Sequence, residues 1–161
     1  MPKKQKSWRE KLESEQEPKI IKINESMAGR FGTRFGDTML IPRPLDVDAC
    51  MKGVQEGKLV TITEIREKLA RDFHVTSTCP MTTGIFAWVA AGAADEDEKA
   101  GKEDITPYWR TIKVDGSLNP KYPGGVKEQA RRLKNEGHVI ISSRGDKPPK
   151  VKDFEKSVQK L

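Results

Sequence analysis

The strongest constraint on the fold is a pair of short helices predicted between residues 61 and 94. Thr61 is followed three residues later by Glu64, a capping box that predicts a helix starting near Ile62. The apolar stripe of this helix consists of Ile62, Ile65, Leu69 and Phe73. A polar turn then leads to Pro80, which favours a second helix over residues 81–94. Two short helices joined by a brief turn are typical of a helix-turn-helix.

The second helix is slim, because alanine and glycine make up most of residues 87–94. Small side chains allow close approach to another surface, either a DNA groove or a neighbouring helix, and packing inside a protein is the commoner reason. The acidic run that follows, residues 95–98, is expected to be a solvated loop or a fraying helix end. Its charge would repel phosphates, so we expect it to face away from nucleic acid.

The length of 161 residues fits one ordinary domain with tails. Only 35% of the residues are hydrophobic and 34% are charged, which predicts one core flanked by solvated ends. We therefore expect a basic, flexible N-terminal arm over residues 1–39, a folded domain over 40–141 and a basic C-terminal tail over 142–161. In that tail a short amphipathic helix is predicted from Val151, Phe154, Val158 and Leu161.

Two absences narrow the class of protein. No stretch approaches the ~20 apolar residues that span a bilayer, and the charged N-terminus lacks the apolar core of a signal peptide. The two cysteines, Cys50 and Cys79, are too few for a disulfide scaffold. We expect a cytoplasmic protein with free thiols and no membrane partner.

Basic charge is concentrated at the two ends of the chain. Residues 1–44 hold 10 Lys/Arg against 6 Asp/Glu, and residues 142–161 hold 6 against 3, whereas residues 45–141 hold 14 against 15. Basic ends suggest a polyanion such as nucleic acid, and they equally fit tails that only keep the protein soluble.

An interleaved repeat adds a second hint of nucleic-acid binding. Arg30-Phe31-Gly32 and Arg34-Phe35-Gly36 repeat at a spacing of four. Arginine binds phosphate and phenylalanine stacks on bases, so Arg30 and Arg34 are candidate DNA contacts. A loop whose two phenylalanines dock on the core explains the repeat equally well.

The sequence patterns that would indicate a metal site or a catalytic nucleophile are weak. Cys50, His74, Cys79 and His138 lack the spacing of zinc sites, and Gly124-Gly125 is not followed by the Lys-Ser or Lys-Thr of a P-loop. Neither a metal nor another cofactor is expected, and no catalytic residue is assigned.

Three blocks in fixed order carry a family resemblance. Residues 57–61 (GKLVT) lead into the first helix. Residues 107–110 (PYWR) precede a strand and the hairpin turn Asp115-Gly116, and residues 122–125 (YPGG) open a helix that ends at Glu136-Gly137. From about residue 40 to 138 the chain resembles the DNA-binding domain of the alkylguanine–DNA alkyltransferases. It is more similar still to alkyltransferase-like proteins, which lack the catalytic cysteine. The implied fold is α+β and mainly helical, a winged-helix-like helix-turn-helix domain with a short β-hairpin.

The resemblance implies a base pocket without alkyl-transfer chemistry. The reactive motif of the family reads Pro-Cys-His-Arg, and here Tyr108 and Trp109 stand between Pro107 and Arg110. Alkyl acceptance needs an activated thiolate, which a phenol with a pKa near ~10 does not replace. The implied pocket, formed by Pro107, Tyr108, Trp109, Gly124 and Gly125, would hold a flipped base between aromatic faces.

The resemblance also implies a DNA surface at the start of the second helix. Thr82, Thr83 and Gly84 occupy that start, and Arg110 and Lys113 are expected to bind phosphates. Where the family inserts an arginine this chain has Thr83 or Gly84, and its phosphate-rotating tyrosine corresponds to Ile62. Both devices for extruding a base are therefore missing.

Three functions follow from these observations. The first is a non-enzymatic, monomeric protein that binds double-stranded DNA, recognises alkylated or distorted DNA, and works with other DNA-repair proteins. The alternative is a winged-helix protein–protein interaction module that has lost DNA binding. An active alkyl-transfer enzyme is the third, and the altered motif argues against it.

Overall fold

Helices and short strands alternate along the chain. The structure is a computed structural model that describes residues 4–161. Its α-helices are α1 (Trp8–Leu12), α2 (Pro44–Lys52), α3 (Ile62–Asp72), α4 (Pro80–Lys99) and α5 (Gly125–Asn135). Its strands are β1 (Lys19–Lys22), β2 (Thr38–Ile41), β3 (Val60–Thr61), β4 (Ser77–Thr78), β5 (Thr111–Ile112), β6 (Ile140–Ile141) and β7 (Lys150–Val151). Short 3-10 helices are η1 (Arg30–Gly32), η2 (Tyr108–Arg110) and η3 (Phe154–Ser157). This mixture of helices and small sheets agrees with the α+β class predicted from the sequence.

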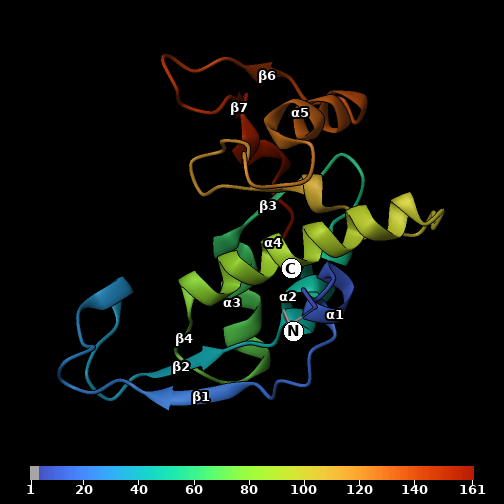
Figure 1. The fold of residues 1–161 in the computed structure, drawn as a ribbon. Helices are drawn as coiled ribbons and strands as arrows, with labels where there is room; N and C mark the ends of the chain where they lie inside the picture. The colour runs from blue at the N-terminus through green and yellow to red at the C-terminus, as the bar shows by residue number, and fades with distance from the viewer. Residues whose placement is uncertain (1–3) are drawn as a thin grey trace.

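The long helix α4 runs through the middle of the molecule (Figure 1). α1, α2 and α3 pack against it, and η2 contacts it as well. At one end β1 pairs antiparallel with β2, and β2 pairs in parallel with β4. β3 pairs in parallel with β5, and β6 pairs antiparallel with β7 beyond α5. The helices therefore form the centre of the molecule, and the short strands lie around them.

The predicted start of the first helix is confirmed at Thr61. Its hydroxyl accepts the Thr63 amide at 3.2 Å, and its own amide donates to the Glu64 carboxylate at 2.8 Å. These two bonds satisfy backbone N–H groups that a helix start leaves free. Ile65 and Leu69 are buried on the inner side of the helix, as the stripe predicted.

The second helix is longer than predicted, because it continues through the acidic run to Lys99. Asp97 is buried and bonded by Arg9 from α1, while Lys99 pairs with Asp95 one turn back at 2.8 Å. The expectation of a solvated loop or a fraying helix end was wrong for Asp97, since Arg9 and Lys102 from outside the helix neutralise its charge.

The N-terminal segment forms α1 and β1 where a flexible arm over residues 1–39 was expected, and residues 1–3 lie outside the described residues. α1 docks on α4, and Trp8 stacks edge-on against Trp88 with their ring centroids 4.8 Å apart. β1 then pairs along its whole length with β2, from Lys19 opposite Ile41 to Lys22 opposite Thr38. Leu12 is 1% exposed and belongs to the core. Short elements like these take their stability from tertiary partners, so local sequence did not reveal them.

The predicted hairpin is reduced to its turn. The Lys113 amide donates to the Ser117 carbonyl at 2.9 Å, and the Gly116 amide donates to the Lys113 carbonyl at 2.8 Å, with φ +86° at Gly116. The strand before the turn pairs with β3, and the chain after it pairs with the C-terminal segment through Ser117 and Lys150. Beyond the turn itself, the segment before it therefore pairs with β3 and the segment after it pairs with the C-terminal segment.

The predicted C-terminal amphipathic helix is also absent. A short 3-10 helix, η3, replaces it, entered through Asp153 with φ +52°. Beyond it Val158 forms a parallel bridge with Leu59, and the Gln159 amide donates to the Leu59 carbonyl at 2.8 Å. This long-range pairing holds residues 158–159 extended.

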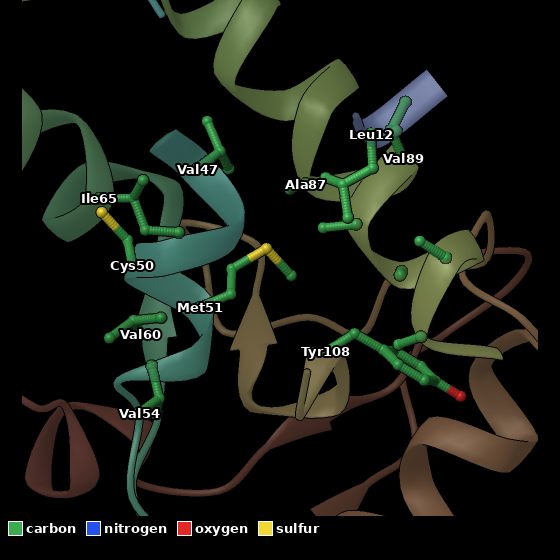
Figure 2. Close-up of a cluster of buried hydrophobic side chains, with 14 of the residues drawn as sticks. Leu12, Val47, Cys50, Met51, Val54, Val60, Ile65, Ala87, Val89 and Tyr108 are labelled. Carbon is green, nitrogen blue, oxygen red and sulfur yellow. The ribbon is translucent and has the colours of Figure 1, made fainter. Parts of the chain in front are cut away.

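Two clusters of buried side chains hold the fold together. Figure 2 shows most of the larger one, in which α2 and α4 face each other across Met51 and Tyr108 completes one side. The smaller cluster consists of Leu59, Ile112, Leu118, Leu133 and Val151. Trp109 packs against both clusters. Within residues 4–161, no helix combines the length and the apolar character that crossing a membrane requires.

Candidate nucleic-acid interface

An open hollow of about 700 Å³ lies between the end of α4 and α5, with Tyr108 in its wall. We call it the Tyr108 pocket. Its lining residues are Asp95, Glu98, Lys99, Tyr108, Pro123, Gly124, Lys127, Glu128, Ala130, Arg131, Arg132 and Lys134. Five of these side chains are basic and three are acidic, so the rim carries a net positive charge. The net charge favours an anionic ligand, but Asp95 and Glu98 lie in the same rim, so the expectation that the acidic run faces away from this surface is wrong for these two residues.

Tyr108 is rigidly placed. Its ring is 1% exposed and meets the rings of Trp109 and Tyr122 edge-on, with centroids 5.4 and 5.7 Å away. Its hydroxyl lies 3.4 Å from the Pro123 carbonyl, a long contact. Burial raises the pKa of Tyr108 to about 12, so the phenol is neutral at physiological pH. A neutral phenol is a poor nucleophile.

Arg132 covers the two aromatic residues of the altered motif. Its guanidinium carbon lies 4.5 Å from the ring centre of Trp109 and 5.5 Å from that of Tyr108. The same guanidinium donates to Glu128 at 3.0 Å and to Glu98 at the end of α4. Arg132 therefore ties α5 to α4 and closes one side of the pocket.

Glu136 joins three separate segments just after α5. Its carboxylate accepts the Trp109 indole N–H, the Arg110 Nε–H at 2.9 Å and the Gly57 amide at 3.0 Å. Burial works to raise the pKa of Glu136, but these hydrogen bonds and the Arg110 charge outweigh it, and the pKa lies below its usual value of 4.5. The carboxylate is therefore ionised and firmly held.

The remaining motif residues face elsewhere. The Arg110 side chain is 15% exposed, and its Nη1 donates to the Val54 carbonyl at 2.7 Å. Pro107, Trp109 and Arg110 line a second hollow of about 490 Å³, separate from the Tyr108 pocket. Of the five residues predicted for a base pocket, the structure brings Tyr108 and Gly124 to one cavity and Pro107 and Trp109 to another.

The glycine loop shapes the pocket's other wall. Gly124 caps α5 with φ +76°, and a side-chain carbon there would collide with Cβ of Glu128. Glycine is therefore required at this position. Gly125 also has a positive φ, +69°, and is not among the lining residues.

The first half of α4 presents an uncharged face. Met81, Ile85 and Trp88 are 65%, 52% and 38% exposed, and they line a hollow of about 440 Å³ with Gly84. Lys113 and Lys121 line the same hollow. An apolar strip between two lysines can lie against sugars while the cations reach phosphates.

The other residues predicted at the start of α4 point inward or bond locally. Thr83 is fully buried, and its hydroxyl donates to the Cys79 carbonyl at 2.7 Å. The Thr82 hydroxyl donates to the Cys79 sulfur at 3.2 Å. Thr83 therefore holds the helix start, and Gly84 is the residue of this group that lines the surface hollow.

Arg30 and Arg34 are exposed on the loop between β1 and β2. The neighbouring Phe31 and Phe35 are 55% and 69% exposed, so they do not dock on the core. The loop has internal order, since the Gly29 amide donates to the Thr33 carbonyl at 2.7 Å. Both predicted arginines thus remain free to meet an external anion.

Neither cysteine is placed as an alkyl acceptor beside the pocket. Cys50 is 4% exposed, and burial raises the pKa of its thiol to about 11. Figure 2 shows Cys50 and Tyr108 on opposite sides of the larger cluster. Cys79 caps α4 and is not among the residues that line the Tyr108 pocket.

Sequence reasoning did not assign the residues that charge and close the pocket. These are Glu98, Lys127, Glu128, Arg131 and Arg132. The run of basic residues in the helix predicted after Gly125 was the signal that could have found Lys127, Arg131 and Arg132. The contribution of α4 was hidden, because the helix was expected to end at residue 94.

Comparisons with known proteins support the fold. The chain matches no protein-family model and no curated protein sequence. Among solved structures it is similar to S. pombe Atl1 in complex with damaged DNA containing O6-carboxymethylguanine, with 19% identity and a TM-score of 0.51. A crystal structure of S. pombe ATL in complex with DNA has the same identity and a TM-score of 0.53. Each match covers 73% of this chain and 94% of the other. The resemblance stated from sequence is therefore confirmed at the level of the fold.

Proposed function

We propose that this protein binds double-stranded DNA and holds an altered base in the Tyr108 pocket without transferring an alkyl group. The proposal rests on the identity and the position of Tyr108. Where a reactive thiol would be needed, a neutral aromatic ring forms the wall of a pocket with a basic rim. The two similar structures are complexes with DNA, and one contains an alkylated guanine.

On this proposal the DNA surface is winged-helix-like. The exposed strip of α4 faces the duplex between Lys113 and Lys121, and Arg30 and Arg34 add phosphate contacts. Arg110 is bonded to Glu136, so we assign it to supporting the pocket. The protein acts as a monomer that marks the damage for other repair proteins.

The residues at the pocket do not provide a nucleophile for alkyl transfer. Alkyl acceptance requires a nucleophile beside the base. The hydroxyl of Tyr108 keeps its proton at neutral pH, and Cys50 is buried as a thiol. Mass spectrometry after incubation with O6-alkylguanine DNA should therefore show an unmodified protein. An alkyl adduct on Cys50 or Cys79 would contradict the proposal.

The pocket is tested by two substitutions of Tyr108. Tyr108→Leu removes the aromatic face and keeps an apolar side chain, and Tyr108→Phe keeps the ring. The ratio of affinities for O6-alkylguanine duplex over plain duplex should fall about ten-fold in Tyr108→Leu, a loss of about 1.4 kcal/mol, because the pocket loses the ring that forms its wall. Tyr108→Phe should retain most of it. If wild type, Tyr108→Leu and Tyr108→Phe show the same ratio, the Tyr108 pocket does not recognise the altered base.

One observation favours a second candidate, a protein–protein interaction module. The exposed strip of α4 is apolar, and no lysine or arginine occurs between Arg71 and Lys99. Titration of plain duplex at low ionic strength separates the two functions, since phosphate contacts are strongest there. Absence of binding under those conditions would favour the interaction module.

A further inference from the structure

A separate hollow of about 440 Å³ lies on the outer side of α3, beside β4. Its lining residues are Thr63, Arg66, Glu67, Ala70, Arg71, Val75, Thr76, Ser77 and Thr78. None of them belongs to the Tyr108 pocket or to the exposed strip of α4. We call this hollow the Arg66 pocket.

Arg66 is a partly buried cation without an acidic partner in residues 4–161. Its Nε donates to the Thr78 carbonyl at 2.7 Å, and the Thr78 hydroxyl donates back to the Arg66 carbonyl at 2.8 Å. Its neighbour Glu67 is exposed, and its charge acts on Arg66 only at a distance, without a close ion pair in the described part of the chain. Burial lowers the pKa of Arg66, because the charge has lost water and the nearby Cys79 and Glu67 offset only part of that loss.

The other arginines do not share this state. Arg9, Arg43, Arg110, Arg131 and Arg132 each form an ion pair with a carboxylate. Arg30, Arg34 and Arg144 are exposed to water. Arg71 is exposed, lines the Arg66 pocket and donates to the Leu161 carbonyl at 2.7 Å.

A second unmatched polar group lies at the same place. The hydroxyl of Ser77 is buried and has no hydrogen-bond partner. Ser77 is also one of the residues that line the Arg66 pocket. A buried hydroxyl without a partner is costly and calls for an explanation. An anion that accepts from both residues would satisfy the two groups together.

We infer that the Arg66 pocket binds a phosphate group, with Arg66 as its main charged partner and Arg71 and Ser77 as further donors. A guanidinium donates to phosphate oxygens through parallel, charge-assisted hydrogen bonds. Thr78 directly precedes Cys79, the cap of α4, so the pocket adjoins the helix that we propose faces DNA. The phosphate could belong to the DNA backbone, an assignment that rests on the proposed function, or to a free phosphate compound.

The first experiment uses inorganic phosphate. The melting temperature of the full chain is measured against phosphate concentration at constant ionic strength, for wild type, Arg66→Gln, Ser77→Ala and Arg144→Gln. Arg144→Gln is the matched control, an exposed arginine in another loop. General exclusion of phosphate from protein surfaces stabilises all four alike, so only differences between them count.

Wild type and Arg144→Gln should show the same saturable rise in melting temperature. The apparent affinity for phosphate should fall about ten-fold or more in Arg66→Gln, as expected for a lost charge-assisted bond, and less in Ser77→Ala. Ser77→Ala removes a hydroxyl that bonds to nothing in the free protein, so its fold is kept. An identical response of all four proteins would overturn the inference.

The second experiment identifies the source of the phosphate. Affinity for plain duplex is measured at several salt concentrations for wild type and Arg66→Gln. A DNA phosphate in the pocket predicts a weaker complex and a salt slope smaller by about one in Arg66→Gln. Unchanged DNA binding, with the phosphate response lost, assigns the pocket to a free phosphate compound. If wild type binds phosphate and no DNA, the proposed function fails and the Arg66 pocket stands.

Discussion

At the scale of single residues, the molecule depends on groups that hold the altered motif from behind. Glu136 accepts hydrogen bonds from Trp109, Arg110 and Gly57, and Arg132 covers Trp109 and Tyr108. The aromatic wall could be predicted, since Tyr108 was identified from the motif. The position of Arg132 over these rings could not, because Tyr108 and Trp109 lie more than 20 residues away and only the fold brings them together.

Glu136 should give the fold a measurable dependence on pH. Its pKa is lower in the folded chain than in the unfolded chain, so its stabilisation is complete above the unfolded value of about 4.5. The stabilisation is lost as the pH falls through the lower folded value. Glu136→Gln should reduce the free energy of unfolding by about 2–4 kcal/mol at pH 7, because Arg110 loses its buried counter-ion.

Urea denaturation at pH 7 and in the acid range measures this effect. The difference between wild type and Glu136→Gln should shrink as the pH falls below about 4.5. Glu56→Gln, at an exposed position nearby, should match wild type throughout. A constant difference at all pH values would show that Glu136 acts through packing and not through its charge.

At the scale of elements, helices with local signals were predictable and elements that need distant partners were not. α3 begins at its capping box, as expected. By contrast, β1 exists because β2 lies beside it, and residues 158–159 stay extended because they pair with Leu59. Apolar spacing alone therefore gave a false helix at the C-terminus.

The docking of α1 on α4 makes a prediction at Gly92. A side-chain carbon at this position would overlap the ring of Trp8. Gly92→Ala should therefore displace α1 and destabilise the fold by about 1–3 kcal/mol, although alanine favours the helix itself. Tryptophan fluorescence should shift toward that of a solvated ring, and proteolysis within residues 4–11 should become faster.

Gly84 supplies the matched control in the same helix. Nothing lies within 4 Å of a side-chain carbon added there. Gly84→Ala should stabilise the protein by up to about 1 kcal/mol, with unchanged fluorescence. Equal effects of the two substitutions would show that Trp8 does not rest on Gly92.

At the scale of the whole molecule, the two buried clusters behave as one unit. Trp109 packs against both, and Glu136 and Val158 tie the C-terminal third to the loop at residues 54–59. Sequence composition predicted one core, and the structure divides it in two around this shared tryptophan. The division depends on which buried residues meet in space, and apolar periodicity does not contain that information.

Unfolding should therefore follow a single cooperative transition. Far-UV circular dichroism reports on the helices, and tryptophan fluorescence reports on Trp8, Trp88 and Trp109 together. In guanidinium chloride the two signals should share one midpoint, as in two-state domains. Separate midpoints would show that the smaller cluster opens independently.

Along its length α4 changes from a partly exposed stretch to a fully buried one, and this change determines which of its positions tolerate substitution. Residues 89–94 are buried on every side, whereas Met81, Ile85 and Trp88 reach the surface. Saturation mutagenesis would find a block of consecutive positions closed to larger side chains, preceded by a stretch that accepts replacement every third or fourth residue. The binding preference of such a protein could diverge at one end of a single helix while the other end preserves the architecture.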